Sequence, residues 1–362
     1  MELLLNEEQV LLRDAAAKLG AAHGGAKRAR LLRLAGAGMD HEGWNEIVEA
    51  GWLSALACEE AGGLGLGAFD LALALEETSK RVMMTPLLET ACAFWAIAEA
   101  RGDLDHATGL VVPATSPPAQ SFNGRQEVHL RDGMLEGVLS FVPFADHAEA
   151  FVVEAVTDGV ACLCLAPRSL DGLTIETVHN VDGSTSSMLT FSHARIGEAQ
   201  VLARGQKAAA IAAKMHDLLS LGASVELLGV AQAALDITLD YIKLRQQFGK
   251  PIGSFQALQH RAVNCYVDLE LNRSLIYAVL SAWDAGAAPP AMVSAVKARL
   301  SRCGLDTVRA ALQLHGAIGY TDEHDIGVYY KRAVALAAKY GNEITHVGRF
   351  SALTTSLSAM QE

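Results

Sequence analysis

The sequence LRQQFGKPIGSFQALQHR, residues 244–261, joins two long stretches that both show a helical pattern of apolar residues. Arg245 ends the first stretch, and Gly249 and Pro251 then interrupt it, because glycine and proline both disfavour a continuing helix. Ser254 is suited to cap the N-terminus of the next helix. The Arg245 guanidinium and a helix N-terminus both favour a phosphate or carboxylate. On spacing alone, an ordinary inter-helix turn with a solvated arginine is the simpler explanation.

The region around this turn, from Gln206 to about Ser356, is helical at unusual length. Three segments rich in Ala and Leu have the helical period, namely 215–244, 255–285 and 291–314. Helices of about 25 to 30 residues exceed the usual globular length and are typical of a four-helix bundle. The third segment leads into QLHGAIGY, residues 313–320, where a glycine either caps the helix or lets a ligand approach the backbone.

The rest of the chain changes character twice. Residues 6 to about 107 are also helical, whereas residues 108–200 contain short segments rich in Val, Leu and Thr, separated by turn residues. These segments predict an antiparallel sheet pair or a small barrel. The sequence therefore predicts a mainly α, α+β fold: an N-terminal all-helical domain (1–107), a middle β-sandwich or barrel domain (108–200) and a C-terminal four-helix-bundle domain (201–362).

Composition excludes several classes of function. The chain has 362 residues, of which 51% are hydrophobic, and 29 basic against 41 acidic residues give a net charge of −12. That balance argues against nucleic-acid binding. The six cysteines lack zinc spacing, so we expect no metal and a reducing, cytoplasmic location. No uncharged apolar stretch of about 18 residues occurs, so we expect no membrane span.

The two segments from the bundle region, taken with a third near the N-terminus, resemble the acyl-CoA dehydrogenase family of flavoproteins. Residues 245–261 match the signature R-x-Q-F-G-x-x-I-x-x-F-Q-x-L-Q-H-R of a bacterial subfamily that includes heteromeric enzymes with small subunits. Residues 313–320 match that family's Q-L-H-G-x-I-G-Y motif. The N-terminal pattern is matched by Gly51-Trp52, by EEAGGLG at 59–65 and by Glu76-Glu77.

The resemblance implies FAD as cofactor and oxidation of an acyl-CoA substrate to the 2,3-enoyl-CoA, with electrons passing to an acceptor such as electron-transfer flavoprotein. It also implies an oligomer in which some residues serve a flavin seated mainly on a neighbouring subunit. It assigns the pyrophosphate contact to Arg245. The other cofactor contacts that it assigns are Gln247, Phe255 and Gln256 toward the adenosine half, Gln313, His315, Gly316 and Ala317 toward the pyrophosphate, Phe141 toward the isoalloxazine, and Phe248 as a further cofactor contact.

The catalytic base of the family is missing from both of its usual positions. A thioester α-proton is weakly acidic, so a close and desolvated carboxylate must remove it. The two family positions for this glutamate align here with Gly341 and Leu219. Glu343 is a weak candidate two residues further on. Glu226 lies deeper in a helix, where a polar residue on a bundle face is the better interpretation.

The middle region departs from the family too. The family's T-E-P-x-x-G-S-D loop corresponds to residues 112–119, which lack that pattern. Pro143 stands where a threonine usually contacts the flavin, and proline has neither a hydroxyl nor an N–H. Ser220 stands in place of the family's substrate-binding arginine. We expect Lys331 and Arg332 to lie on a solvated helix face, with CoA phosphates as the alternative partner.

Two interpretations follow. In the first, the chain is the non-catalytic subunit of a heteromeric enzyme, such as a heterotetramer, and supplies FAD-binding residues to an active acyl-CoA dehydrogenase partner. In the second, it is a self-sufficient homo-oligomeric dehydrogenase with a relocated base such as Glu343. The first is favoured, because the motifs that reach across an interface are present while those within an active site are lost.

Overall fold

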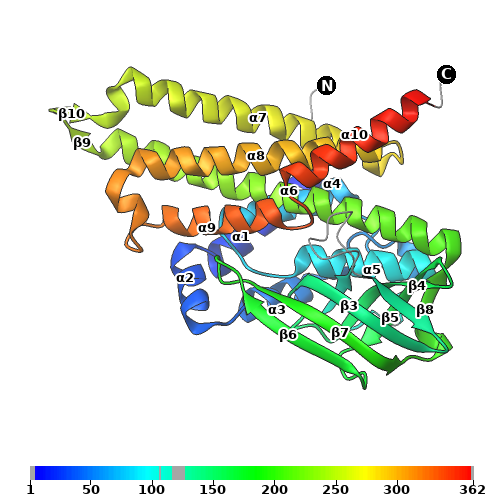
Figure 1. The fold of residues 1–362 in the computed structure, drawn as a ribbon. Coiled ribbons are helices and arrows are strands. Elements are labelled where there is room, and N and C mark those ends of the chain that lie inside the picture. The colour runs from blue at the N-terminus through cyan, green and yellow to red at the C-terminus, as the bar shows by residue number, and fades with distance from the viewer. Residues whose placement is uncertain (1–4, 106, 116–126, 360–362) are drawn as a thin grey trace. The chain divides into compact units, whose positions relative to one another are not determined.

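The computed structural model of the protein describes residues 5–105, 107–115 and 127–359 (Figure 1). The chain forms two compact units, one of residues 1–34, 68–83 and 220–362, the other of residues 35–67 and 84–219. The predicted succession of helical, β and helical regions is confirmed. The predicted domain boundaries fall near changes of secondary structure, whereas each unit draws on more than one predicted segment.

The first unit is helical. α8 (Pro290–His315) packs against α7 (Gln256–Asp284), α9 (Ile326–Ala338) and α10 (Glu343–Ala359), as Figure 1 shows. Near the N-terminus, α1 (Glu7–His23) packs against α4 (Ala68–Lys80), and α2 (Ala26–Ala35) follows α1. The long helix α6 (Gly205–Leu244) passes from the second unit into the first at residue 220.

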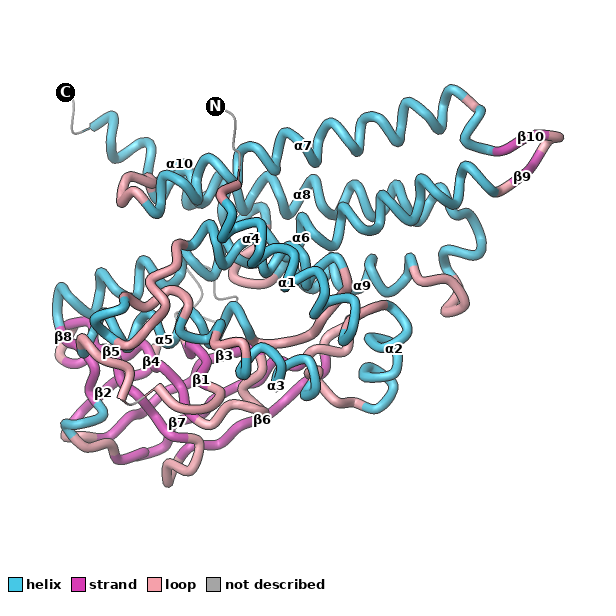
Figure 2. Tube along the Cα trace, turned by 180° about the vertical axis from the view of Figure 1, so that it is seen from behind, coloured by secondary structure: helices cyan, strands magenta, loops and turns pink. Residues whose placement is uncertain are grey.

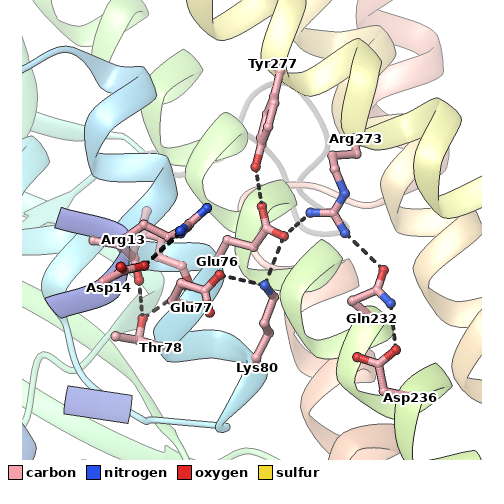
Figure 3. A network of polar contacts seen from close by, with 12 residues as sticks. Arg13, Asp14, Glu76, Glu77, Thr78, Lys80, Gln232, Asp236, Arg273 and Tyr277 are labelled. Carbon is pink, nitrogen blue, oxygen red and sulfur yellow. Dashed lines mark hydrogen bonds and ion pairs between the residues drawn. The ribbon is translucent and has the colours of Figure 1, made fainter. Parts of the chain in front are cut away.

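α4 is fixed on α7 at two points, two helical turns apart. The Asp284 carboxylate accepts hydrogen bonds from the backbone N–H groups of Ala68 and Phe69, at 2.7 and 3.0 Å. This side chain from α7 therefore caps the N-terminus of α4. Seven residues further along α4, the buried Glu76 carboxylate pairs with Arg273 and accepts the Tyr277 hydroxyl at 2.9 Å (Figure 3). The two helices therefore run antiparallel.

Two glycines let α6 approach its neighbours closely. A Cβ at Gly229 would lie 2.5 Å from the backbone oxygen of Glu76 on α4. A Cβ at Gly304 of α8 would lie 2.6 Å from the Leu227 side chain of α6. Both distances are shorter than van der Waals contact allows, so glycine is needed at each helix crossing.

The second unit contains one mixed sheet in the order β6-β7-β3-β2-β4-β5-β8, with β1 paired to β4 (Figure 2). Most pairs are antiparallel, but β1 and β2 both run parallel to β4. The predicted middle β domain is confirmed, and its described strands belong to one mixed sheet. Their bounds are Val111–Ala114, Val128–Arg131, Met134–Pro143, Ala150–Thr157, Val160–Pro167, Leu173–His179, Thr185–Arg195 and Val201–Arg204. This unit also contains α3 (His41–Glu49), α5 (Leu87–Arg101) and the first part of α6, residues 205–219.

The apolar length of α6 does not indicate a membrane segment. By length and composition this helix could cross a bilayer, but 89% of its apolar window is buried inside the structure. It is therefore a core helix, whose length and apolar composition match those of a membrane span because it is buried inside the protein.

Candidate functional site

The predicted flavin-binding segment after α6 forms a small hairpin. β9 (Gln246–Gln247) pairs with β10 (Lys250–Pro251), and the short 3₁₀ helix η4 (Ile252–Ser254) follows. The prediction that Ser254 caps α7 is wrong, because its hydroxyl donates to the Pro251 carbonyl and Phe255 precedes the helix. This hydrogen bond keeps the Ser254 hydroxyl within the turn that precedes α7, so it does not reach the N–H groups of the helix. The helix then starts without a side-chain cap.

An aromatic ring stands out at the tip of the hairpin. Phe248 has a left-handed φ of 53° and is 88% exposed, so the fold gains no burial from placing a large side chain in this conformation. Its ring meets Phe255 edge to face at 6.1 Å, and the Lys250 ammonium lies 4.4 Å from the Phe255 ring. The hairpin therefore presents aromatic and cationic groups to the outside.

The donors around the hairpin are not used by the chain itself. In the described part of the protein, the Arg245 guanidinium and the side-chain amides of Gln247, Gln256 and Gln313 have no hydrogen-bond or ion-pair partner, and all four residues are exposed. A guanidinium suits a pyrophosphate, and primary amides suit the polar edges of a nucleotide. This donor set therefore fits the pyrophosphate and adenosine half of a dinucleotide such as FAD.

The second predicted segment forms a turn after α8. Gly316 has φ 66°, its N–H donates to the Gln313 carbonyl, and a Cβ there would have no atom within 4 Å. The 3₁₀ helix η5 (Gly316–Tyr320) follows, with Ala317 exposed. Because no atom covers Gly316 and the Gln313 amide beside it is exposed, a ligand has room to lie against the backbone here.

His315 is different, because its side chain is buried inside the unit. Its Nδ1 lies 2.8 Å from the Ala311 carbonyl oxygen and must carry the proton, since a carbonyl only accepts. Burial lowers the pKa of His315, so Nε2 keeps a lone pair and has no partner in the described structure. A neutral Nε2 cannot donate to a phosphate. The geometry supports a role for His315 inside the turn rather than through a side-chain contact.

The structure places no carboxylate at either expected base position. Leu219 is fully buried on α6. Gly341 follows Tyr340 in a tight turn after α9, and the two residues have φ values of 104° and 59°. A Cβ at Gly341 would lie 2.8 Å from His346 Nε2, which itself lies 2.9 Å from the Tyr340 carbonyl oxygen. This turn has no room for a longer side chain at residue 341.

Lys339, next to this turn, pairs with Glu226. The Lys339 ammonium lies 3.1 Å from one carboxylate oxygen of Glu226, and the Arg332 guanidinium lies 3.4 Å from the other. The prediction of a solvated Arg332 is wrong: this residue is buried, whereas Lys331 pairs with Asp322 at the surface. Glu226 is thus the anion of a buried ion pair. It is not positioned as an independent base.

A buried lysine and a buried histidine hold the same region. Lys297 Nζ donates to the carbonyls of Leu336 and Ala337, at 3.1 and 3.2 Å, and so satisfies the end of α9. Burial lowers the pKa of Lys297 to about 7. Burial likewise lowers the pKa of His346 to about 4. The turn at residues 339–341 is therefore anchored on both sides.

Glu343, the alternative base, lies at the start of α10. Its side chain is 43% exposed and pairs with the more exposed Arg302 at 3.6 Å. A base for a thioester α-proton needs desolvation, which this position does not provide. In the described residues, no group of three or more His, Cys, Asp or Glu could hold a metal ion.

The predicted isoalloxazine contact lies in the second unit. Phe141 is exposed with φ 60°, and Pro143 pairs with Ser186 between β3 and β7. Pro143 therefore offers neither a hydroxyl nor an N–H to a flavin ring. Of the loop corresponding to the family's T-E-P-x-x-G-S-D pattern, residues 116–119 lie outside the described residues.

Three residues near these sites were missed by sequence reasoning: Tyr241, Lys297 and Lys339. Tyr241 stands four residues before Arg245, which places it on the same helix face and could have singled it out. The side chain of Lys297 falls on the apolar stripe of its helix with Val293 and Leu300, which also could have indicated burial. No sequence signal pairs Lys339 with Glu226, because their contact spans more than a hundred residues.

Comparison with known proteins identifies relatives over nearly the whole chain. Residues 6–100 match the model for "Acyl-CoA dehydrogenase, N-terminal domain", and residues 217–348 match "Acyl-CoA dehydrogenase, C-terminal domain". The chain is 30% identical over 345 residues to acyl-CoA dehydrogenase IpdE2 of Mycolicibacterium smegmatis, covering 93% of this chain and 96% of the relative.

Solved structures agree with this similarity. A variant of the Tcur3481-Tcur3483 steroid ACAD superposes with a TM-score of 0.87 at 26% identity, covering 98% of this chain and 99% of that one. The ChsE4-ChsE5 complex from Mycobacterium tuberculosis gives the same TM-score and the same coverage at 22% identity. At 22% identity, the similarity to the ChsE4-ChsE5 complex shows only that the fold is shared.

Proposed function

Because the chain belongs to the acyl-CoA dehydrogenase family, whose cofactor is FAD, we propose that it is the non-catalytic subunit of a heteromeric acyl-CoA dehydrogenase. In this role it contributes Arg245 and the turn at residues 313–317 to an FAD seated mainly on an active partner. We place this assembly in the cytoplasm. Electron-transfer flavoprotein is the acceptor that the family resemblance favours.

One contrast carries the proposal. The donors suited to the pyrophosphate and adenosine half of FAD are exposed and have no partner within the described chain. The positions suited to a base carry Gly341 and Leu219, and the neighbouring Lys339 is ion-paired with Glu226. The chain therefore has the means to hold a flavin and lacks a placed group to remove the α-proton.

When bound, FAD would supply the acceptor for the hydride that leaves the β-carbon of the thioester. The part of this chain is to hold the cofactor. Arg245 offers a planar pair of N–H donors to the pyrophosphate, and charge-assisted hydrogen bonds of this kind contribute about 1.5–3 kcal/mol. Gln247, Gln256 and Gln313 supply neutral donors and acceptors, and Phe248 offers a ring face to the adenosine end.

An uncovered apolar surface on α7 supports assembly with a partner. Val263, Tyr266, Val267 and Leu271 recur at helical spacing on one face of α7, and all four are exposed. Such a stripe on a helix that is otherwise packed is typical of a subunit interface. It begins just over two turns after Phe255, so a partner that covers it would also lie near the flavin contacts.

The heteromeric form is supported by the names of similar structures, since a two-component steroid ACAD and the ChsE4-ChsE5 complex are both among them. We extend this to the substrate class only as far as an acyl-CoA with a bulky acyl group, such as a steroid-derived one. The described residues assign no contact to the acyl chain itself.

Expression of the chain alone, and together with a candidate catalytic acyl-CoA dehydrogenase subunit from the same organism, tests the proposal. We expect the chain alone to be poor in FAD and inactive, and the co-purified complex to show flavin absorption and acyl-CoA oxidation. Arg245→Ala should deplete the complex of FAD, whereas Arg302→Ala, which removes another exposed arginine of the same unit, should not. A yellow homo-oligomer that oxidises an acyl-CoA unaided would show that the alternative, a self-sufficient enzyme, is correct.

A further inference from the structure

An aromatic stack joins the two predicted flavin-binding segments within the first unit. The Tyr241 ring on α6 lies 4.4 Å from the His315 imidazole, with an angle of 26° between the planes. The Tyr241 hydroxyl donates to the His315 carbonyl at 3.4 Å. On its own helix, the Tyr241 carbonyl accepts the N–H of Arg245 at 2.8 Å. Tyr241 therefore contacts both the residue before Gly316 and the base of the Arg245 hairpin.

The stack continues to the far end of the same turn. The His324 imidazole lies 4.3 Å from that of His315 and 5.7 Å from the Tyr241 ring. His324 Nδ1 accepts the N–H of Ile326 at 3.2 Å, which fixes its ring at the start of α9. The segment between His315 and His324 is thus held at both ends against one tyrosine.

The chemistry of His315 matches this structural role. Its side chain is buried, burial lowers its pKa, and the imidazole is held in one orientation by the Ala311 carbonyl. A neutral, oriented ring packs on a phenol without bringing a charge into the interior. The neighbouring rings of Tyr241 and His324 then determine where the turn at residues 316–317 can lie.

We infer that Tyr241 and His324 are positioning residues for the cofactor, because they fix the Gln313–Ala317 turn relative to Arg245 before any ligand binds. The inference rests on the proposed function. A ligand that must contact both segments gains affinity when their separation is already set, since less freedom is lost on binding. Neither residue needs to touch FAD for this effect.

The inference predicts a graded series of variants. Tyr241→Leu removes the stack and should raise the rate of FAD release at least fivefold. Tyr241→Phe keeps the ring and loses only a long hydrogen bond, so it should stay within twofold of the original. The matched control is Tyr329→Phe, which removes a hydroxyl that donates to the Lys80 carbonyl at 3.1 Å elsewhere in the unit.

A comparison of two flavins separates positioning from general stability. FAD carries the pyrophosphate and adenosine, whereas FMN keeps one phosphate and lacks the adenosine half, so a change in the geometry of these contacts should weaken FAD binding more than FMN binding. The assay is flavin fluorescence during release from, and rebinding to, the co-purified complex. Because Tyr241→Leu could fail to fold, His324→Leu is the second variant, and it should also reduce the preference for FAD over FMN.

The outcomes distinguish this inference from the function on which it rests. If Arg245→Ala releases FAD while Tyr241→Leu and His324→Leu retain it as the original does, the positioning role is refuted and the proposed function stands. If Arg245→Ala also leaves FAD retention unchanged, the proposed function itself fails. An equal loss of FAD and FMN binding in the stack variants would indicate a merely structural role and would overturn the inference.

Discussion

Replacement of Glu76 by leucine tests the buried network that joins α4 to α7. The Glu76 side chain is 3% exposed, and its carboxylate pairs with Arg273 and accepts the Tyr277 hydroxyl (Figure 3). Glu76→Leu keeps the volume nearly constant but leaves the guanidinium without its buried counter-ion. Removal of one partner from a buried ion pair usually lowers the free energy of unfolding by about 4 kcal/mol.

The expected loss here is smaller, because Arg273 keeps other contacts. Its guanidinium also donates to Gln232 at 3.0 Å and to Glu270 at 3.3 Å, and its side chain is 19% exposed. Partial solvation and the remaining carboxylate compensate part of the charge. We therefore expect Glu76→Leu to lower the free energy of unfolding by about 2–3 kcal/mol.

The neighbouring residue on the same helix provides the control. Glu77 pairs with Lys80 at 2.7 Å near the surface, so Glu77→Leu should cost about 0–1 kcal/mol. The double variant Glu76→Leu with Arg273→Leu removes both charges and should recover at least about 1 kcal/mol relative to the sum of the single changes. Because the chain has two compact units, hydrogen exchange of the α4 amides is the assay that reports on this contact specifically.

The network would be shown to be energetically unimportant by either of two results. One is an equal effect of Glu76→Leu and Glu77→Leu on the opening free energy of the α4 amides. The other is strict additivity in the double variant, which would mean that Glu76 and Arg273 do not interact.

Three further predictions concern other parts of the first unit. Burial lowers the pKa of His346 from 6.5 to about 4, so the unfolded chain binds more protons than the folded one between these pH values. The free energy of unfolding should therefore fall by about 3 kcal/mol as the pH falls through this range. Urea unfolding of His346→Leu as a function of pH should lack this loss. Gly341→Glu should lower the melting temperature and yield no acyl-CoA oxidation, because residue 341 has φ 104° and faces His346. Acyl-CoA oxidation by this variant would show that the turn can accommodate a glutamate at residue 341. Asp284→Ala should cost about 0.5–2 kcal/mol in urea unfolding through the lost cap of α4, and a stability of Asp284→Ala equal to that of the original protein would show that the cap contributes nothing.

The long helices could be predicted almost to their ends from periodicity. The predicted segments 255–285 and 291–314 differ from α7 and α8 by one residue at each end. The predicted start of α6 is ten residues late, because the stretch from Gly205 to Lys214 is rich in alanine and has Ile211 as its one large apolar residue, which is too few to reveal a stripe. A helical period is thus visible only where bulky side chains mark it.

Strand pairing and buried charge could not be predicted in the same way. The middle segments indicate strands, but the parallel pairing of β1 and β2 with β4 depends on contacts between residues distant in sequence. Likewise, the pattern of α9 gives no sign that Arg332 faces a carboxylate on α6. Local periodicity indicates which face of a helix is apolar, whereas the partner of a buried cation is decided by tertiary packing.

Different contacts hold the turn at residue 341 and the proposed flavin-binding segments. The turn at Gly341 is fixed by His346 and Lys297, and the exposed donors are fixed by the stack of Tyr241 and His315. A carboxylate at residue 341 would require a new backbone conformation and the displacement of a buried imidazole. Removal of the Arg245 guanidinium, in contrast, would disturb no hydrogen bond or ion pair within the described chain. In the proposed function, the chain keeps a cofactor in place for a partner that removes the α-proton, which is the division of labour that a heteromeric enzyme requires.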